Sequence, residues 1–187
     1  DPTLASMTTA AINVLSKNTQ GYVLLVEGGR IDHANHMGNA FRALDETIAM
    51  SDAVRAAVTA TSASDTLILV TADHSHVLSF SGYPVRGNPM LGKVRGPGGE
   101  DGSRSDYARD LLGLPFTTLN YTNGPGYSGA SNAQPAGPKK FEHEVSGFDP
   151  AEGRPDLTHV DTEDPDFMQE TIFPLKSETH GGDDVGI

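Results

Sequence analysis

The chain has 187 residues, of which 36% are hydrophobic, and 13 Lys and Arg stand against 25 Asp and Glu, for a net charge of −12. This length is enough for one domain with a sizeable core, whereas the acidic balance argues against a nucleic-acid partner, which would require a basic face. No apolar run approaches the roughly 20 residues that span a bilayer, and the absence of cysteine means that any bound metal must be held by oxygen and nitrogen ligands.

The first expected element is an amphipathic helix over residues 3–17. Asp1 before Pro2 is a helix-start signal. Apolar side chains recur at helical spacing at Leu4, Met7, Ala11, Ile12 and Leu15. We expect this helix to cover one face of a sheet.

The next run, residues 21–26, is short and apolar, which is typical of a buried parallel strand. Glu27 lies at its carboxyl end, and the flexible pair 28–29 allows the chain to enter a helix near Asp32. Asp32 and His36 are then four residues apart on one helix face, close enough to chelate one ion.

A second helix is predicted over residues 32–59, which links two strands as a right-handed crossover. Its inward stripe, interpreted as core packing, contains Met37, Phe41, Leu44, Ile48, Ser51 and Val58. Residues 66–71 again predict a buried strand, followed at once by Asp73 and His74. In open α/β sheets, sites form beyond the carboxyl ends of strands, so both acid-and-histidine clusters lie where such a fold carries its chemistry.

Gly and Pro are frequent between residues 82 and 153, near the compositional range in which a regular core fails to form. The convincing strand in this zone covers residues 116–121. His143 and His159 lie in polar surroundings and are interpreted as exposed surface residues. The acidic run at 161–166 is interpreted as a solvated loop, with a calcium site as the less favoured alternative.

Three clusters of acids and histidines, at residues 27–36, 71–76 and 178–184, contain the ligand types that bind zinc and magnesium without thiolates. Each pair alone is more often a solvated surface feature than a metal site. His180 by itself carries no signal. Two clusters beyond buried strands make coincidence improbable, and they predict either metal-assisted hydrolysis or metal storage.

Four segments resemble alkaline phosphatases in the same order and at compatible separations. They are Val-Glu-Gly-Gly-Arg-Ile-Asp-His at 26–33, Thr-Ala-Asp-His-Ser-His at 71–76, Asn-Gly-Pro-Gly-Tyr at 123–127 and Glu-Thr-His-Gly-Gly-Asp-Asp at 178–184. The resemblance covers most of the chain and is loosest between about residues 130 and 176.

The resemblance implies six metal ligands in three sets. They are Asp32, His36 and His180 for a first zinc, Asp73 and His74 for a second zinc, and Glu27 for magnesium. It also implies that His33 stands beside the phosphate or its magnesium-bound water. His76 would be hydrogen-bonded to a zinc-binding carboxylate such as Asp32.

No catalytic nucleophile is identified in this chain. Members of the family take a serine nucleophile, a shared aspartate, a magnesium-binding Ser or Thr and usually a phosphate-binding arginine from an upstream segment, and no Asp-Ser-Ala motif occurs here. The chain is therefore expected to be the carboxyl-side portion of a catalytic domain, with the N-terminal half of the same enzyme missing. We expect it to be inactive alone.

The expected fold is α/β: a three-layer α/β/α sandwich with a mixed sheet and an inserted, loop-rich crown subdomain. Residues 1–121 would form part of the α/β domain, 122–176 the crown-like insertion, and 177–187 the return to the α/β domain. In family members such a crown helps build a homodimer, which is the expected assembly here.

The resemblance implies hydrolysis of phosphate monoesters through a phosphoserine, with two zinc ions and one magnesium ion and with inorganic phosphate as product. It places the protein in the periplasm or outside the cell, with surface anchoring left open. Two alternatives remain. One is another hydrolase of the same superfamily, such as a phosphodiesterase or a sulfatase, and the other is a non-catalytic metal-binding module with closed ligand shells.

Overall fold

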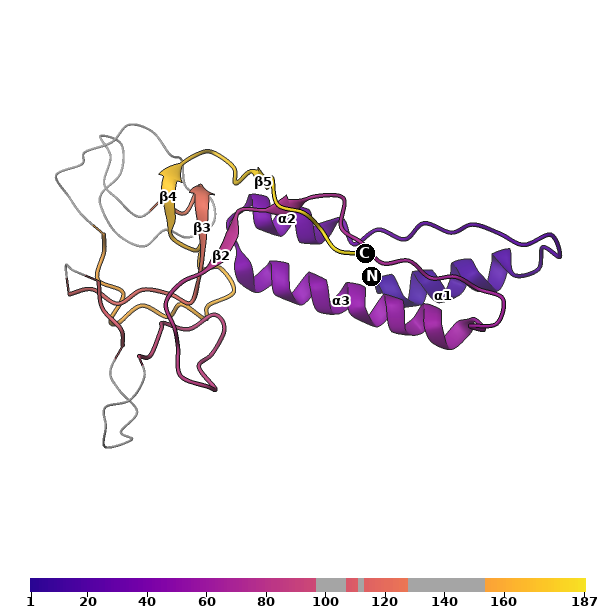
Figure 1. Cartoon of the computed structure of the whole chain (residues 1–187), viewed down its shortest axis with the longest axis horizontal. Helices are drawn as coiled ribbons and strands as arrows, with labels where there is room; N and C mark the ends of the chain where they lie inside the picture. The colour runs from indigo at the N-terminus through magenta and orange to yellow at the C-terminus, as the bar shows by residue number, and fades with distance from the viewer. Residues whose placement is uncertain (97–106, 111–112, 128–153) are drawn as a thin grey trace.

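The computed structural model describes residues 1–96, 107–110, 113–127 and 154–187. In this part of the chain, three helices and five short strands are formed. Figure 1 shows an elongated molecule with a helical arm at one end and the larger sheet at the other. The functional clusters of the sequence lie at the junction of these two parts.

The helical arm is built from α1 (Leu4–Leu15) and α3 (Ala40–Ala60), which pack side by side. Ile12 of α1 and Ala53 of α3 are buried. The side chain of Thr3 accepts a hydrogen bond from the Ser6 amide at 3.1 Å and so satisfies a free donor of the first turn. The helix predicted over residues 3–17 is therefore confirmed, with slightly shorter ends.

The single helix predicted over residues 32–59 is wrong in its continuity, because α2 (Arg30–His36) ends before α3 begins. Gly38 has a φ of +67°, a left-handed conformation that ends helices and suits glycine. The Asn39 side chain then accepts from the Arg42 amide at 2.9 Å and caps α3. This break sets the direction of α2 independently of the long helix.

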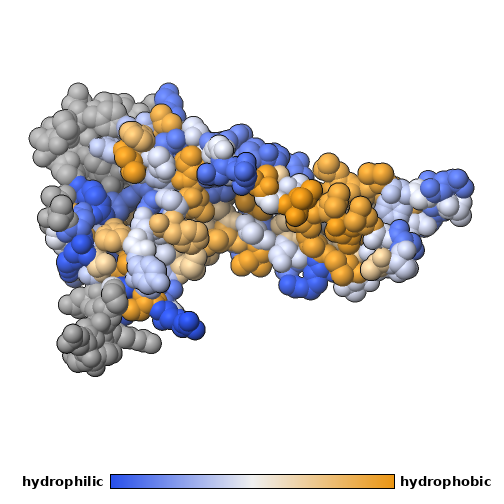
Figure 2. All heavy atoms as spheres, in the orientation of Figure 1, coloured by the Kyte–Doolittle hydropathy of each residue, from blue (hydrophilic) through white to orange (hydrophobic). Residues whose placement is uncertain are grey.

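The regular strands predicted over residues 21–26 and 66–71 are wrong for this structure. Both segments run extended along the helical arm without entering a ladder. Val23 is 94% exposed and Leu67 is 81% exposed, although the sequence predicts burial. A strand needs a neighbour for its backbone groups and a cover for its side chains, and the described residues supply neither. Apolar side chains therefore gather on the surface of the arm (Figure 2).

The five strands form two small sheets. One pairs β1 (Ser75–His76) antiparallel with β5 (His180–Gly181), and the other is a mixed sheet in the order β2 (Leu78–Phe80), β3 (Leu119–Gly124) and β4 (Thr171–Pro174). The strand predicted over residues 116–121 overlaps β3 and is confirmed in part. Helices and a mixed sheet agree with the predicted α/β class. The three-layer sandwich stays a prediction, since its central strands are unpaired here.

The buried core at the junction joins helix to sheet through Ala40 of α3 and Leu119 and Tyr121 of β3. The Tyr121 hydroxyl donates to Oδ1 of Asn35 on α2 at 2.7 Å. Burial raises the pKa of Tyr121, and the nearby carboxylate of Glu178 raises it further. This core holds α2 against the sheet and fixes the position of its functional side chains.

The boundaries predicted at 1–121, 122–176 and 177–187 stay predictions, and residues 128–153 of the expected insertion lie outside the described residues. Strand β4 nevertheless pairs with β3, and Arg154 forms ion pairs with Asp110 and Glu170. The described ends of the expected insertion are thus continuous with the larger sheet.

No helix among the residues that the structure describes has both the length and the apolar character that crossing a bilayer requires.

Candidate metal centre

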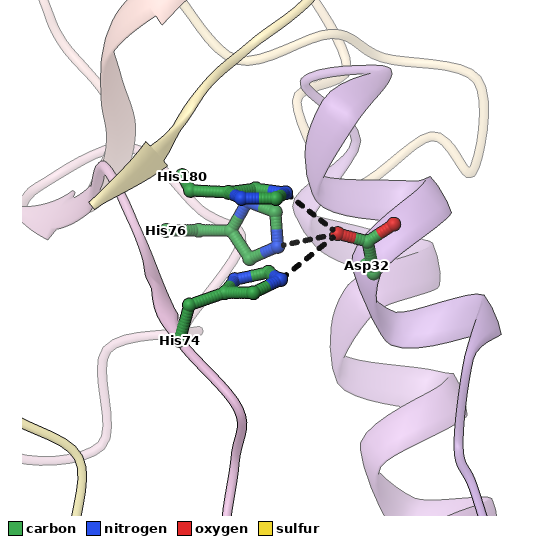
Figure 3. A group of neighbouring side chains, drawn as sticks. All are labelled: Asp32, His74, His76 and His180. Atoms are coloured by element: carbon green, nitrogen blue, oxygen red, sulfur yellow. Dashed lines mark ion pairs between the residues drawn. The ribbon is translucent and has the colours of Figure 1, made fainter. Parts of the chain in front are cut away.

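Part of each of the three clusters meets where α2 faces the small β1–β5 sheet, namely Asp32, His36, His74, His76, Glu178 and His180. Asp32 and His36 lie on α2, His74 immediately precedes β1, and the ladder register sets His76 opposite His180. Figure 3 shows the three sheet-side imidazoles pointing at Asp32. Segments that are far apart in the sequence are therefore brought together, with α2 on one side and the paired strands β1 and β5 on the other.

Four imidazole nitrogens surround a single carboxylate oxygen, Oδ1 of Asp32. The distances from the Nε2 atoms to it are 3.2 Å for His36, 3.2 Å for His76, 3.3 Å for His180 and 3.7 Å for His74. The rings of His74 and His180 stack with centroids 3.5 Å apart. This is a dense set of nitrogen and oxygen donors, which is the chemistry that zinc prefers when thiolates are absent.

Hydrogen bonds at the other ring nitrogen show which way each imidazole presents its lone pair. Nδ1 of His36 lies 2.6 Å from the carbonyl oxygen of Glu178, and Nδ1 of His74 lies 3.2 Å from that of Ser75. A carbonyl can only accept, so both Nδ1 atoms are donors, and in the neutral form of such a ring the lone pair lies on Nε2. Anchoring of this kind is typical of metal-binding histidines.

The centre contains buried polar atoms that protein groups leave unsatisfied. In the described residues, neither Oδ1 of Asp32 nor Nε2 of His76 has a hydrogen-bond partner. Lone pairs that face one another in a buried position are unfavourable unless a cation lies between them. These orphaned atoms, together with the donor set, fit a bound divalent cation.

The three residues expected at the first zinc lie together. Nε2 of His180 is 3.2 Å from Nε2 of His36, although 144 residues separate them in the sequence, and both face Asp32. His76, expected to be hydrogen-bonded to a zinc-binding carboxylate such as Asp32, has its Nε2 3.2 Å from the same Asp32 oxygen without a hydrogen bond to it, and its ring bonds instead to Glu178. The roles of these side chains as ligands stay predictions, while their convergence is a property of the structure.

Of the residues expected at the other two ions, His74 lies in the cluster around Asp32, whereas Asp73 and Glu27 lie further out. Nε2 of His74 is 3.5 Å from Oδ2 of Asp73, but the Asp73 side chain is 88% exposed. Glu27 and His33 are exposed, and neither belongs to the groups of described side chains whose donor atoms could share an ion. The second zinc and magnesium sites are therefore only partly assembled by these residues.

The predictions for residues outside the clusters concern His143, His159 and the acidic run at 161–166. His159 is exposed, as expected, and Asp161 in the acidic run is exposed within a series of turns. His143 lies outside the described residues. Residues 161, 163, 165 and 166 are exposed but Thr162 is buried, so the solvated-loop interpretation of residues 161–166 agrees with the structure in part.

Glu178 is a functional candidate that sequence reasoning assigned no role. Its side chain is completely buried, with Oε2 at 2.7 Å from Nδ1 of His76 and Oε1 accepting from the Val77 amide at 2.8 Å. It forms a second group of possible ligands with His36 and His76. The only signal in the sequence was its position two residues before His180, which does not reveal burial.

Comparison with known proteins agrees with the motifs. The family model for alkaline phosphatase matches residues 1–187. Over all 187 residues, the chain is 44% identical to the membrane-bound alkaline phosphatase of Bombyx mori, 38% to the alkaline phosphatase of Gadus morhua and 40% to the tissue-nonspecific isozyme of alkaline phosphatase of Felis catus. It spans 28%, 33% and 30% of the lengths of these relatives, respectively. With these matches and the convergence of its histidines on Asp32, the chain belongs to the alkaline phosphatase family.

Proposed function

We propose that the protein containing this chain is a metal-dependent hydrolase of phosphate monoesters. The observation that carries the proposal is the convergence of four imidazole nitrogens on Oδ1 of Asp32. Membership of the family, and the names of the relatives, support the reaction class. A non-catalytic module would be expected to close its ligand shell with four protein ligands, whereas His180 is half exposed at the edge of the cluster.

Within the site, Asp32, His36 and His180 would hold one zinc ion, Asp73 and His74 would contribute to a second, and Glu27 would contribute to a magnesium site. Bound divalent cations supply Lewis-acid stabilisation of the phosphoryl oxygens and activate water. The hydrogen bonds at the Nδ1 atoms of His36 and His74 keep the metal-facing nitrogens free. Asp32 supplies the negative charge at the centre, and His33 would line the phosphate side.

The nucleophile of the proposed reaction lies outside these 187 residues. A serine oxygen would attack phosphorus, the ester P–O bond would break, and the alcohol would leave with a proton. Water would then attack the phosphoserine, regenerate the serine and release inorganic phosphate. The role of the present chain in both steps is to fix the cations and to orient the substrate phosphate.

The same additional polypeptide would complete the sheet. The extended segments 21–26 and 66–70, together with α1 and α3, line a groove of about 1060 Å³. Leu25 and Leu69 are 83% and 67% exposed, and the backbone beside them lacks a ladder. Strands from the rest of the protein would pair with the backbone of these segments, and the elements packed on the completed sheet would cover their apolar side chains. Together they would form the three-layer sandwich.

For the assembly, we propose a homodimer to which residues 122–176 contribute as a crown-like insertion. For the location, we propose the periplasm or the outside of the cell. One relative is named a membrane-bound alkaline phosphatase, which supports a place at the cell surface.

The proposal is tested by assaying the complete protein after chelation of its metals and again after addition of zinc and magnesium. A chromogenic phosphate monoester should be hydrolysed only in the reconstituted sample. Parallel assays with a phosphate diester and a sulfate ester separate the two hydrolase alternatives. Faster hydrolysis of the phosphate diester or of the sulfate ester than of the monoester would overturn the proposed function. Zinc binding without hydrolysis of any of the three substrates would overturn it as well.

A further inference from the structure

Glu178 is a buried acid whose ion-pair partners in the described part of the chain are both histidines. Its Oε2 atom is 2.7 Å from Nδ1 of His76 and 3.7 Å from Nδ1 of His36. A completely buried carboxylate is costly unless hydrogen bonds compensate it, and here the Val77 amide supplies a further bond at 2.8 Å. Glu178 thus contacts two histidines of the metal centre at their Nδ1 atoms, on the other side of each ring from the Nε2 atom that faces Asp32.

The backbone around Glu178 is held firmly in place. Its amide donates to the carbonyl oxygen of His36 at 2.9 Å. Asn123 and Thr179 exchange two hydrogen bonds, at 2.9 and 3.0 Å. Gly124 has a φ of +138°, and a Cβ at that position would lie 3.2 Å from Cβ of Glu178. The close approach of β3 therefore requires glycine and leaves Glu178 little freedom to move.

Two different parts of this one residue anchor two rings. The main-chain carbonyl of Glu178 binds Nδ1 of His36 at 2.6 Å, and its carboxylate binds Nδ1 of His76 at 2.7 Å. In both rings Nε2 then points to the same oxygen of Asp32, at 3.2 Å. Glu178 thereby couples a ring on α2 to a ring on β1.

We propose that Glu178 is a positioning residue of the metal centre, which holds His76 by its carboxylate and His36 by its carbonyl so that both Nε2 atoms face Asp32. The proposal rests on the proposed metal-binding function and adds a residue to it. It predicts that the two rings respond differently to a substitution. Replacing the Glu178 side chain removes the hydrogen bond to His76, whereas the hydrogen bond to His36 remains in every variant because its acceptor is the main-chain carbonyl.

Glu178→Gln is the sharpest variant, because it preserves size and removes one acceptor. In Glu178 the Val77 amide and Nδ1 of His76 bond to different carboxylate oxygens; a glutamine amide places an NH₂ donor at one of these two positions, so both bonds cannot be kept in this geometry. The matched control is Glu163→Gln, since Glu163 is exposed. Ring-nitrogen NMR of ¹⁵N-histidine-labelled, metal-stripped protein should show changed His76 signals, with His36 signals retained, in Glu178→Gln and no change in Glu163→Gln.

Zinc affinity gives a second readout, measured by competition with a chromophoric chelator. Loss of a group that orients a ligand typically weakens metal binding about 10- to 100-fold, and we expect a decrease in this range for Glu178→Gln. In a His76→Gln background, the same substitution should have little further effect, because its target ring is gone. An equal decrease in both backgrounds, or unchanged His76 signals, would overturn the proposal.

Two outcomes keep this inference separable from the proposed function. If the unmodified protein does not bind zinc, the metal centre is refuted, whereas the histidine spectra still test the anchoring by Glu178. If Glu178→Gln fails to fold, the spectrum of the unmodified protein decides: Nδ1 of His76 must carry a proton that is hydrogen-bonded to Glu178, and an unprotonated Nδ1 would contradict the assignment.

Discussion

The metal centre and the helical arm were both anticipated from short sequence patterns, yet only the ligand cluster around Asp32 is assembled by contacts within the described residues. At the centre, strand pairing sets His76 opposite His180, and Glu178 bonds to two further segments. On the arm, the apolar segments 21–26 and 66–71 lack ladder partners and expose their side chains. The contrast teaches that the ligand cluster is closed by contacts within these residues, whereas the segments expected in the supporting sheet find no pairing strand among the described residues.

The largest effect should appear on separating this chain from the rest of the protein. We expect the 187 residues alone to show no measurable turnover of a chromogenic phosphate ester, even with added zinc and magnesium, because in the proposed function the nucleophile comes from another segment and because Asp73 and Glu27 lie outside the ligand cluster. Poor solubility is expected as well, from the exposed strand segments. Adding the upstream portion in trans serves as the positive control. Robust turnover by the chain alone would place the nucleophile within it.

A smaller but still large effect is expected from removing a ligand in the complete protein. Asp32→Ala and His36→Ala should lower zinc content and turnover together. Because both side chains are expected to bind the metal directly, the loss of turnover should exceed the factor of about 10 to 100 that is typical of residues that only orient ligands. His159→Ala, on the surface, should change neither quantity. Metal analysis beside phosphate-ester kinetics measures both. Normal zinc content and full activity in His36→Ala would exclude its role as a ligand.

The arm can be probed with a charge on one of its extended segments. Leu67→Asp should lower the free energy of unfolding of the complete protein by about 3 kcal/mol, because an unpaired carboxylate would be buried in the completed sheet. Leu67→Met, which nearly conserves volume, should cost less than about 1.5 kcal/mol. Urea unfolding of both variants gives the comparison. A negligible effect of Leu67→Asp would mean that Leu67 stays as exposed in the complete protein as it is here, at 81%.

The same contrast explains how much could be inferred from the sequence. Periodicity predicted α1 well, because an amphipathic helix is a local pattern. It merged α2 with α3, although Gly38 followed by Asn39 is itself a C-cap and N-cap signal. The buried strands failed since a ladder depends on partners that a local run does not contain.

The site shows a similar limit. The neighbourhood of Asp32 and His36 followed from helical spacing, whereas the addition of His180 came from the family resemblance and from no pattern in the residues. Glu178 was overlooked because its significance depends on burial and on two long-range hydrogen bonds. What identifies Glu178 is its place between β3 and two histidines, and only the tertiary structure shows that placement.

The smallest expected effect concerns the bond by which the sheet holds α2. Tyr121→Phe removes the donor to Asn35 and leaves a buried acceptor unpaired, which should cost about 1–3 kcal/mol of unfolding free energy at pH 8. The substitution Tyr83→Phe, at a tyrosine that is 88% exposed, should cost little.

The pH dependence of that cost gives a test of sign. Burial, and then the charge of Glu178, raise the folded-state pKa of Tyr121 above the value of about 10 expected in the unfolded chain. The stability that the tyrosine contributes is therefore complete below about pH 10 and is lost as pH rises from there through the raised folded pKa. Phenylalanine does not titrate, so the gap between the wild type and Tyr121→Phe should narrow by up to about 1.4 kcal/mol per pH unit above pH 10. Urea unfolding at pH 8, 10 and 11 measures it. A gap that stays constant or widens would show that Tyr121 is not held neutral beside Glu178, and that the junction between the arm and the metal centre is looser than the structure has it.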